Sequence, residues 1–144
     1  MLNDKIFLTQ TDTTIGFVSQ NKAKLDEIKN RPSHKHYIKA VNSLKTLKLF
    51  TRVPKEHKNR VRKSTKTTFI MPNSHSYRLI QDKHHLLLLE RLKWAYTTSA
   101  NLSGEAYDEK FAKENADVII EPLQTSQKAS TIYRLGKKTI KKVR

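Results

Sequence analysis

Short apolar runs alternate with helix-like segments along the chain, and this alternation restricts the fold more than any other feature of the sequence. Some strands follow each other directly, whereas others are separated by a helix. This order predicts one mixed α/β or α+β sheet domain that spans residues 1–144. The strand-like runs lie at residues 6–8, 37–41, 67–71, 77–80, 94–98 and 118–120. The helical patterns lie at residues 22–29, 44–50, 55–63, 82–91 and 107–115.

Prolines and capping residues set the predicted ends of several elements. Pro32 ends the first helix because the residue before a proline avoids the α region. Pro54 suits the first position of a helix. Asn42 or Ser43, and further along Asp82, can cap the helices that follow them, since their side-chain oxygens accept hydrogen bonds from free backbone N–H groups. These signals support the helices placed after residues 43, 54 and 82.

Two connections are predicted from their turn residues. Polar residues 9–14 are expected to form a loop after the first strand, with Gly16 allowing another segment to come close. Residues 131–135 and 139–143 are expected to form a terminal hairpin that turns at Gly136.

The chain is strongly basic. It carries 29 Lys and Arg against 13 Asp and Glu, which gives a formal net charge of +16. A charge of this size favours an anionic partner such as RNA, DNA, nucleotide phosphates or a membrane surface. A generally basic composition that serves solubility explains the same number, so charge alone does not choose among these readings.

Several classes of site and location are disfavoured by what the sequence lacks. There is no cysteine, so disulfides, thiolate metal sites and thiol nucleophiles are excluded. None of the six histidines has the spacing of a zinc-binding helix. The longest apolar run, residues 86–89, is far too short to span a bilayer, and the first nine residues do not resemble a signal peptide. A cytoplasmic protein without membrane association is expected.

Three polar clusters could carry chemistry because each lies near the end of a predicted element. They are residues 11–17, residues 29–35 and residues 97–104. In open α/β sheets, ligands bind beyond the ends of the strands. Hydroxyl, amide and cationic side chains together suit a nucleoside triphosphate, because Arg and Lys neutralise phosphate oxygens. Taken singly, each cluster is an ordinary turn or a solvated helix end.

The chain lacks the common phosphate-binding motifs GxxxxGK[ST] and GxGxxG. Carboxylates are scarce, which disfavours a metal site built from protein side chains. Mg²⁺ bound with ATP would therefore be held mostly by the nucleotide phosphates and by water.

The three clusters together resemble the threonylcarbamoyl-AMP synthase family, the Sua5/YciO/YrdC group, over about residues 6–135. Residues 97–104 (TTSANLSG) are similar to its serine–alanine–asparagine loop, and residues 29–32 (KNRP) to its lysine–x–arginine–proline motif. Residues 11–17 (TDTTIGF) resemble the threonine-rich loop after its first strand. The chain resembles a short, divergent member of bacterial type.

This resemblance implies a twisted open sheet with a basic concave cleft of YrdC type. It also implies a nucleotidyltransferase that converts L-threonine, bicarbonate and ATP into threonylcarbamoyl-AMP and pyrophosphate. A partner complex would then transfer the group to adenosine in the tRNA t6A37 modification.

The resemblance assigns site residues by position. For ATP and its phosphates they are Lys29, Arg31, Lys35, Thr68, Ser99, Asn101, Ser103 and Ser130. For threonine they are Thr11, Arg78 and Thr98. No covalent intermediate and no protein-held metal are expected.

Two other readings stay open. Ile15 stands where the family has an aromatic residue, and Thr65-Lys66 where it has a glycine–proline pair. A catalytically degenerate member that binds nucleotide, tRNA or double-stranded RNA is therefore the alternative. The RNA reading rests on the net charge and on two basic runs, residues 55–66 and 137–144. Few aromatic residues lie in these runs, which gives little support for stacking on single-stranded bases. A carbamoyl-handling domain, as in hydrogenase-maturation proteins of this fold, is the third reading.

Overall fold

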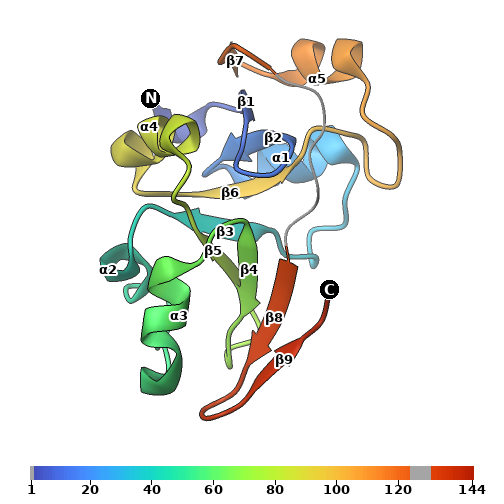
Figure 1. Ribbon diagram of the computed structural model, residues 1–144. Helices are drawn as coiled ribbons and strands as arrows, with labels where there is room; N and C mark the ends of the chain where they lie inside the picture. The colour runs from blue at the N-terminus through green and yellow to red at the C-terminus, as the bar shows by residue number, and fades with distance from the viewer. Residues whose placement is uncertain (1, 124–130) are drawn as a thin grey trace.

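Nine strands form one mixed sheet in the computed structural model, which describes residues 2–123 and 131–144 (Figure 1). The strands lie in the order β7-β1-β2-β6-β3-β5-β4-β8-β9. They are β1 (Phe7–Gln10), β2 (Ile15–Ser19), β3 (Ile38–Val41), β4 (Thr67–Ile70), β5 (Ser76–Leu79), β6 (Trp94–Ser99), β7 (Val118–Ile119), β8 (Thr131–Leu135) and β9 (Ile140–Lys142). The helices are η1 (Leu2–Asp4), α1 (Lys22–Lys29), α2 (Leu44–Leu47), η2 (Lys55–His57), α3 (Lys58–Lys63), α4 (Lys83–Leu92) and α5 (Glu109–Asn115).

The sheet combines parallel and antiparallel pairs, as the interleaved sequence pattern predicts. β1 pairs with β7, β3 with β5 and β4 with β8 in parallel, and the other neighbours are antiparallel. The predicted terminal hairpin is confirmed as β8 and β9, with Leu135 opposite Ile140. The mixed α/β fold class is therefore correct.

Strand β2 was not predicted, because residues 15–19 carry no periodic pattern of polar and apolar side chains. All five of its residues, from Ile15 to Ser19, are buried, so polar and apolar side chains do not alternate along it. The predicted close approach at Gly16 is confirmed. A Cβ atom at this position would lie 2.7 Å from the backbone oxygen of Thr98, so only glycine lets β2 pair with β6 here without a shift.

Capping residues start the helices as expected. The Ser43 hydroxyl accepts the N–H of Thr46 at 3.1 Å at the start of α2. The Asp82 carboxylate accepts the N–H of His85 at 2.9 Å at the start of α4. Each cap pairs a backbone donor that has no partner within its own helix.

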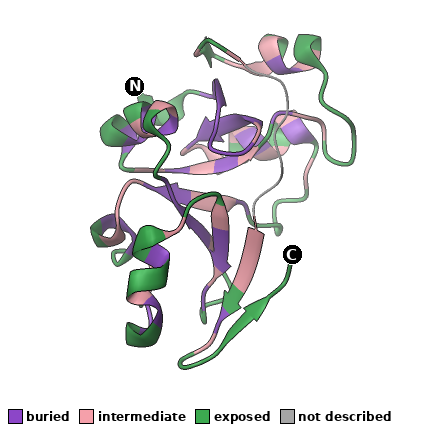
Figure 2. Cartoon of the chain, viewed as in Figure 1, coloured by how far each residue is buried: buried purple, intermediate pink, exposed green. Residues whose placement is uncertain are grey.

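Apolar side chains are buried in three clusters. Figure 2 shows that much of the central strands is buried, whereas the helices carry both buried and exposed residues. Side chains alternate between the two faces of a strand. Phe17 of β2 packs in a cluster with Leu25 of α1, and the next residue, Val18, packs in a cluster with Leu89 of α4. Helices α1 and α4 therefore cover opposite faces of the sheet. A third cluster joins β3, β4 and β5 to α2 and α3.

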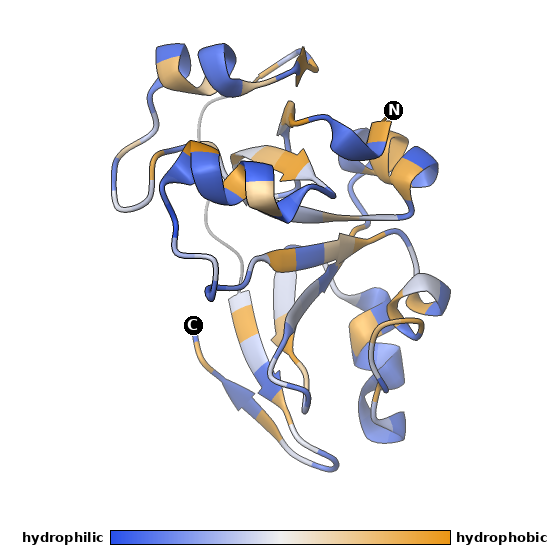
Figure 3. Ribbon diagram, turned by 180° about the vertical axis from the view of Figure 1, so that it is seen from behind, coloured by the Kyte–Doolittle hydropathy of each residue, from blue (hydrophilic) through white to orange (hydrophobic). Residues whose placement is uncertain are grey.

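The predicted polar helix at residues 55–63 forms as two short pieces, η2 and α3. Only His57 and Val61 are buried in them, so this segment presents most of its cations to solvent. In Figure 3 the ribbon of α3 is coloured mostly as hydrophilic. No helix in the described part of the chain is both long and apolar enough to cross a bilayer.

Candidate functional site

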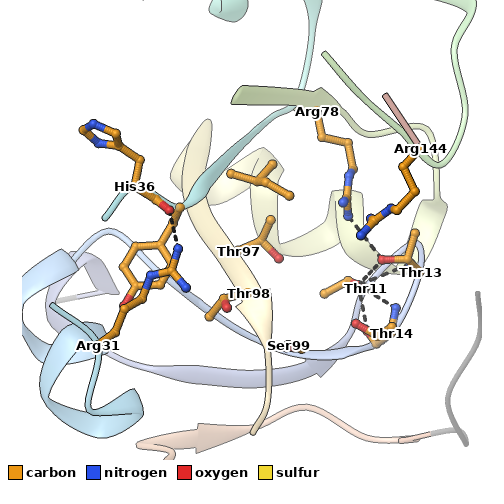
Figure 4. A pocket seen from close by; sticks show the side chains of 12 residues that line it. Thr11, Thr13, Thr14, Arg31, His36, Arg78, Thr97, Thr98, Ser99 and Arg144 are labelled. Atoms are coloured by element: carbon orange, nitrogen blue, oxygen red, sulfur yellow. Dashed lines mark hydrogen bonds between the residues drawn. The ribbon is translucent and has the colours of Figure 1, made fainter. Parts of the chain in front are cut away.

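A cavity of about 410 Å³ lies where the turn between β1 and β2 meets β3, β5 and β6. This size falls within the usual range for small-molecule sites. Figure 4 shows side chains from separate parts of the chain around it. Its lining residues are Thr11, Thr13, Thr14, Arg31, His36, Tyr37, Ile38, Arg78, Thr97, Thr98, Ser99 and Arg144.

The turn before β2 is closed by the side chain of Thr11. Its hydroxyl oxygen accepts the N–H groups of Thr13 at 3.3 Å and Thr14 at 3.2 Å, and its O–H donates to the Thr14 carbonyl at 2.7 Å. Short hydroxyl side chains often form such local bonds. Thr11 therefore lines the cavity, but its own hydroxyl is engaged in shaping the cavity wall.

Arg78 of β5 is held in one orientation by three side chains. Its Nε and Nη2 donate to the Thr68 hydroxyl at 3.1 and 3.0 Å. Its Nη1 donates to Asp12 Oδ1 at 3.1 Å and to the Thr13 hydroxyl at 3.2 Å. Thr68, predicted as a nucleotide contact, thus lies behind Arg78. These bonds fix the orientation of the guanidinium in the cavity wall.

The ion pair beneath the cavity is deeply buried, and this changes its proton affinities. Burial raises the pKa of Asp12, and Arg78 opposes that change. Burial likewise lowers the pKa of Arg78, opposed by Asp12. His85 Nδ1 lies 4.0 Å from Asp12 Oδ1, and burial, with help from Arg78, lowers the pKa of His85 to about 3. His85 is therefore neutral near pH 7.

Lys29, at the end of α1, fixes the loop after β6. Its ammonium donates to the carbonyl oxygens of Ser99 at 2.8 Å and Asn101 at 2.7 Å. Burial, with a smaller effect from Arg31, lowers the pKa of Lys29 to about 8. The Ser103 N–H donates to the Lys29 carbonyl at 3.1 Å, which closes the connection from the other side. The lysine and the serine–asparagine loop therefore form one unit.

The Ser99 hydroxyl donates to Asn101 Oδ1 within this loop. Asn101 Nδ2 donates to the carbonyl oxygens of Leu102 at 2.9 Å and Glu105 at 2.6 Å. Asn101 faces a smaller hollow of about 260 Å³, which shares Thr14 and Ser99 with the larger cavity. The two hollows adjoin at Ser99.

Arg31 enters the cavity from the segment after α1. Its Nη2 donates to the His36 carbonyl at 2.7 Å, and its guanidinium lies 4.8 Å from the ring centroid of Tyr37. Its Nε is buried and has no hydrogen-bond partner among the described residues. An unpaired buried donor is costly and calls for a specific explanation, such as a water, an ion or a functional contact.

The predicted site residues divide into three groups. Thr11, Arg31, Arg78, Thr98 and Ser99 line the cavity. Lys29, Thr68, Asn101 and Ser103 support it from behind or beside it. Lys35 is exposed and outside the lining, and Ser130 lies outside the described residues. The ligand contacts assigned to all of these residues stay predictions.

Arg144 is a cavity residue that the sequence did not reveal. The segment after β9 returns along β8, where the Arg144 N–H donates to the Ile132 carbonyl at 3.2 Å, and Figure 4 shows its side chain beside Arg78 and Thr13. In the sequence it is one of several cations in residues 137–144, a run assigned to RNA. No local pattern separates it from its neighbours.

Metal binding by protein side chains has no visible basis in residues 2–123 and 131–144. No group of three or more His, Asp or Glu residues is placed there to hold an ion. Asp12 is the acidic residue beneath the cavity, and it is already paired with Arg78.

The fold and cavity define a mixed α/β protein with a cavity lined by arginines and hydroxyl groups. The chain belongs to the Sua5/YciO/YrdC family, whose profile, described as telomere recombination, matches residues 1–144.

Three similar proteins extend the comparison. An uncharacterized protein of Mycoplasma pneumoniae, the MG259 homolog, is 30% identical in an alignment over 145 residues. That alignment covers 90% of this chain and 30% of the other protein. P. abyssi Sua5 complexed with L-threonine has a TM-score of 0.81 at 17% identity, covering 99% of this chain and 51% of Sua5. HypF in its phosphate- and nucleotide-bound form has a TM-score of 0.76 at 18% identity, covering 99% of this chain and 27% of HypF. At these identities the two structures show the fold alone. The chain spans about a third of the curated relative and about half of Sua5.

Proposed function

We propose that this protein is a threonylcarbamoyl-AMP synthase that uses L-threonine, bicarbonate and ATP and releases pyrophosphate. The observation that carries the proposal is the convergence of Arg31, Arg78 and Arg144 with two hydroxyl-bearing segments on one cavity. Family membership supports it, as do the threonine complex of Sua5 and the nucleotide-bound form of HypF.

The chemistry requires positioning and charge neutralisation. The threonine amine attacks the carbon of bicarbonate, forming a C–N bond and releasing water. An oxygen of the resulting carbamate attacks the α-phosphorus of ATP, and the bond from that phosphorus to the leaving pyrophosphate breaks. All three reactants are charged or strongly polar, so fixed cations lower the barrier by holding them together and stabilising charge on the phosphoryl oxygens.

The cavity offers a distinct group for each task. Arg31 and Arg144 flank the cavity and would bind phosphate oxygens. Arg78, held by Asp12 and Thr68, would meet the carboxylate of threonine. Lys29 would act through the loop that presents Ser99, as a positioning residue.

Mg²⁺ would neutralise phosphate charge when it enters with ATP. This ion is commonly held by nucleotide phosphates and water with few protein ligands. The proposal therefore assigns no protein ligand to the metal.

Pyrophosphate release tests the proposal. Purified protein with ATP, Mg²⁺ and bicarbonate should release pyrophosphate when L-threonine is added and little without it. Arg31→Ala should lower the rate by at least about tenfold, because one positioned cation stabilises the transition state by several kcal/mol. Arg60→Ala removes an exposed arginine of α3 outside the cavity and should leave the rate unchanged. A folded protein that binds ATP but releases no pyrophosphate is the degenerate member instead.

Transfer of the product to t6A37 of tRNA by a partner complex is part of the same proposal. It predicts that tRNA is modified only when the transfer proteins are added to this protein and its substrates.

A further inference from the structure

A second hollow, of about 620 Å³, lies apart from the arginine cavity. It is surrounded by residues 50–52 and 54–56, the turn at Pro72 and Asn73 and the turn at Lys137 and Lys138, and none of these lines the first cavity. Figure 1 shows the tip of the β8–β9 hairpin at the bottom of the molecule, away from α1. The hollow is therefore a separate feature.

Its surface combines apolar carbon with cations. Phe50, Pro54 and Pro72 supply apolar contacts. Glu56 is the one carboxylate among the residues that surround it. The surrounding cations, all exposed, are Arg52, Lys55, Lys137 and Lys138.

More positive charge lies beside the hollow. The cation of Lys48 chiefly, and burial and the cations of Lys55 and Arg52 in smaller measure, lower the pKa of Lys58, so each of these three cations lies near Lys58. Within the described part of the chain, no ion pair involves the cations around the hollow or Lys48 and Lys58. Crowded cations of this kind are relieved by an anionic partner.

Phe50 is an anchored ring at the edge of this charge. It contacts Trp94 edge-on, with ring centroids 5.5 Å apart, and Trp94 in turn contacts Tyr96 at 5.3 Å. The Lys39 ammonium lies 3.9 Å from the centroid of Phe50. A ring fixed by such neighbours loses little freedom when another flat group packs on it.

We propose that this hollow binds single-stranded nucleic acid, with an unpaired base against Phe50 and the flanking phosphates on the surrounding cations. Base stacking on an aromatic ring inside a basic groove is how proteins bind single strands with little sequence preference. A duplex would offer its phosphates but keep its base faces stacked inside. The proposal concerns a surface outside the arginine cavity, so it holds or fails independently of the synthase activity.

The test is fluorescence anisotropy with a labelled oligo(U) strand, repeated across a salt series on the full chain. The double variant Lys137→Gln/Lys138→Gln should bind more weakly. The slope of the logarithm of its association constant against the logarithm of the salt concentration should be shallower by about 1.4, since each single-strand phosphate contact contributes about 0.7. Phe50→Leu should weaken binding about tenfold with the slope unchanged, because it removes stacking and not charge. Lys5→Gln with Lys83→Gln removes two exposed lysines elsewhere and should change binding less than twofold.

Three results would overturn the proposal. The first is an equal loss of oligo(U) affinity in the Lys137→Gln/Lys138→Gln and the Lys5→Gln/Lys83→Gln double variants. The second is an unchanged affinity of the Phe50→Leu variant for oligo(U). The third is a duplex that binds the protein as tightly as oligo(U) does. Polyglutamate that competes as well as unlabelled oligo(U) would assign the hollow to acidic protein segments instead. Circular dichroism of Phe50→Leu separates loss of binding from loss of folding, and Phe50→Tyr, which keeps a ring, should bind like the unmodified protein. Oligo(dT) in place of oligo(U) shows whether the 2′-hydroxyl contributes.

Discussion

Removing Asp12 should destabilise the protein far more than removing an exposed carboxylate. The Arg78–Asp12 pair joins Nη1 and Oδ1 at 3.1 Å, and the two side chains are only 6% and 4% exposed. Opposite charges about 4 Å apart attract by about 4 kcal/mol at an effective dielectric constant near 20. Asp12→Ala leaves the buried guanidinium without its counter-charge, which typically costs about 3–5 kcal/mol. Arg78 keeps its bonds to Thr68 and Thr13, so we expect a value near 3 kcal/mol.

Urea unfolding followed by the fluorescence of Trp94, the single tryptophan, measures this free energy. Glu109→Ala is the matched control, because Glu109 pairs with Lys113 at 2.7 Å while 66% exposed, and such pairs contribute at most about 1 kcal/mol. Combining Asp12→Ala with Arg78→Met should recover part of the loss, because no buried charge is then left unpaired. An Asp12→Ala loss below about 1 kcal/mol, or a double variant less stable than Asp12→Ala alone, would refute the reasoning.

Three further variants probe other parts of the structure. Gly16→Ala should cost about 1–3 kcal/mol in a urea titration, because its Cβ would lie 2.7 Å from the Thr98 oxygen; an unchanged midpoint would contradict this. Burial lowers the pKa of His85 to about 3 in the folded protein, whereas the unfolded chain has the usual pKa of about 6.5. Between these two values the unfolded chain binds a proton that the folded protein does not. The free energy of unfolding therefore falls as pH drops from about 6.5 toward 3, by up to about 1.4 kcal/mol per pH unit. His85→Leu should flatten that profile, and an equally steep profile would exclude His85 as the cause. Lys29→Met should lower the unfolding free energy by about 2 kcal/mol and weaken ATP binding in calorimetry, because two loop carbonyls lose their charged donor; unchanged ATP binding would exclude a role for the loop.

Most of the sheet could be predicted from the sequence because its strands carry local signals. Prolines, caps and short apolar runs placed β3 to β6 and the β8–β9 hairpin. Strand β2 was not predicted, because all of its residues are buried and the alternation of polar and apolar residues that marks a half-buried strand is absent. Its pairing with β6 depends on Gly16, a contact between residues more than 80 positions apart.

The sequence motifs identified several residues that line one cavity, but motifs do not give the orientation of their side chains. Arg31, Arg78 and Ser99 do converge on one cavity. The sequence could not show that the Lys29 ammonium turns to the loop carbonyls, because that depends on how α1 packs. Arg144 could not be distinguished from the neighbouring lysines by sequence pattern, because it reaches the cavity through the return of the chain after β9.

The aromatic contacts beside the second hollow were also invisible in the sequence. Phe50, Trp94 and Tyr96 lie in separate segments, outside the basic runs in which stacking residues were sought. The sheet brings them together with Lys39, so a grouping of rings and cations arises from the fold and not from neighbouring positions.

Product analysis with isotopically labelled bicarbonate tests the central claim most directly. The protein is incubated with ATP, Mg²⁺, L-threonine and ¹³C-bicarbonate, and the nucleotides are separated and weighed by mass spectrometry. The proposed synthase predicts threonylcarbamoyl-AMP that carries the label, formed in step with pyrophosphate and lost in Arg31→Ala but not in Arg60→Ala. Folded, ATP-binding protein that yields no labelled adenylate under these conditions would contradict the account.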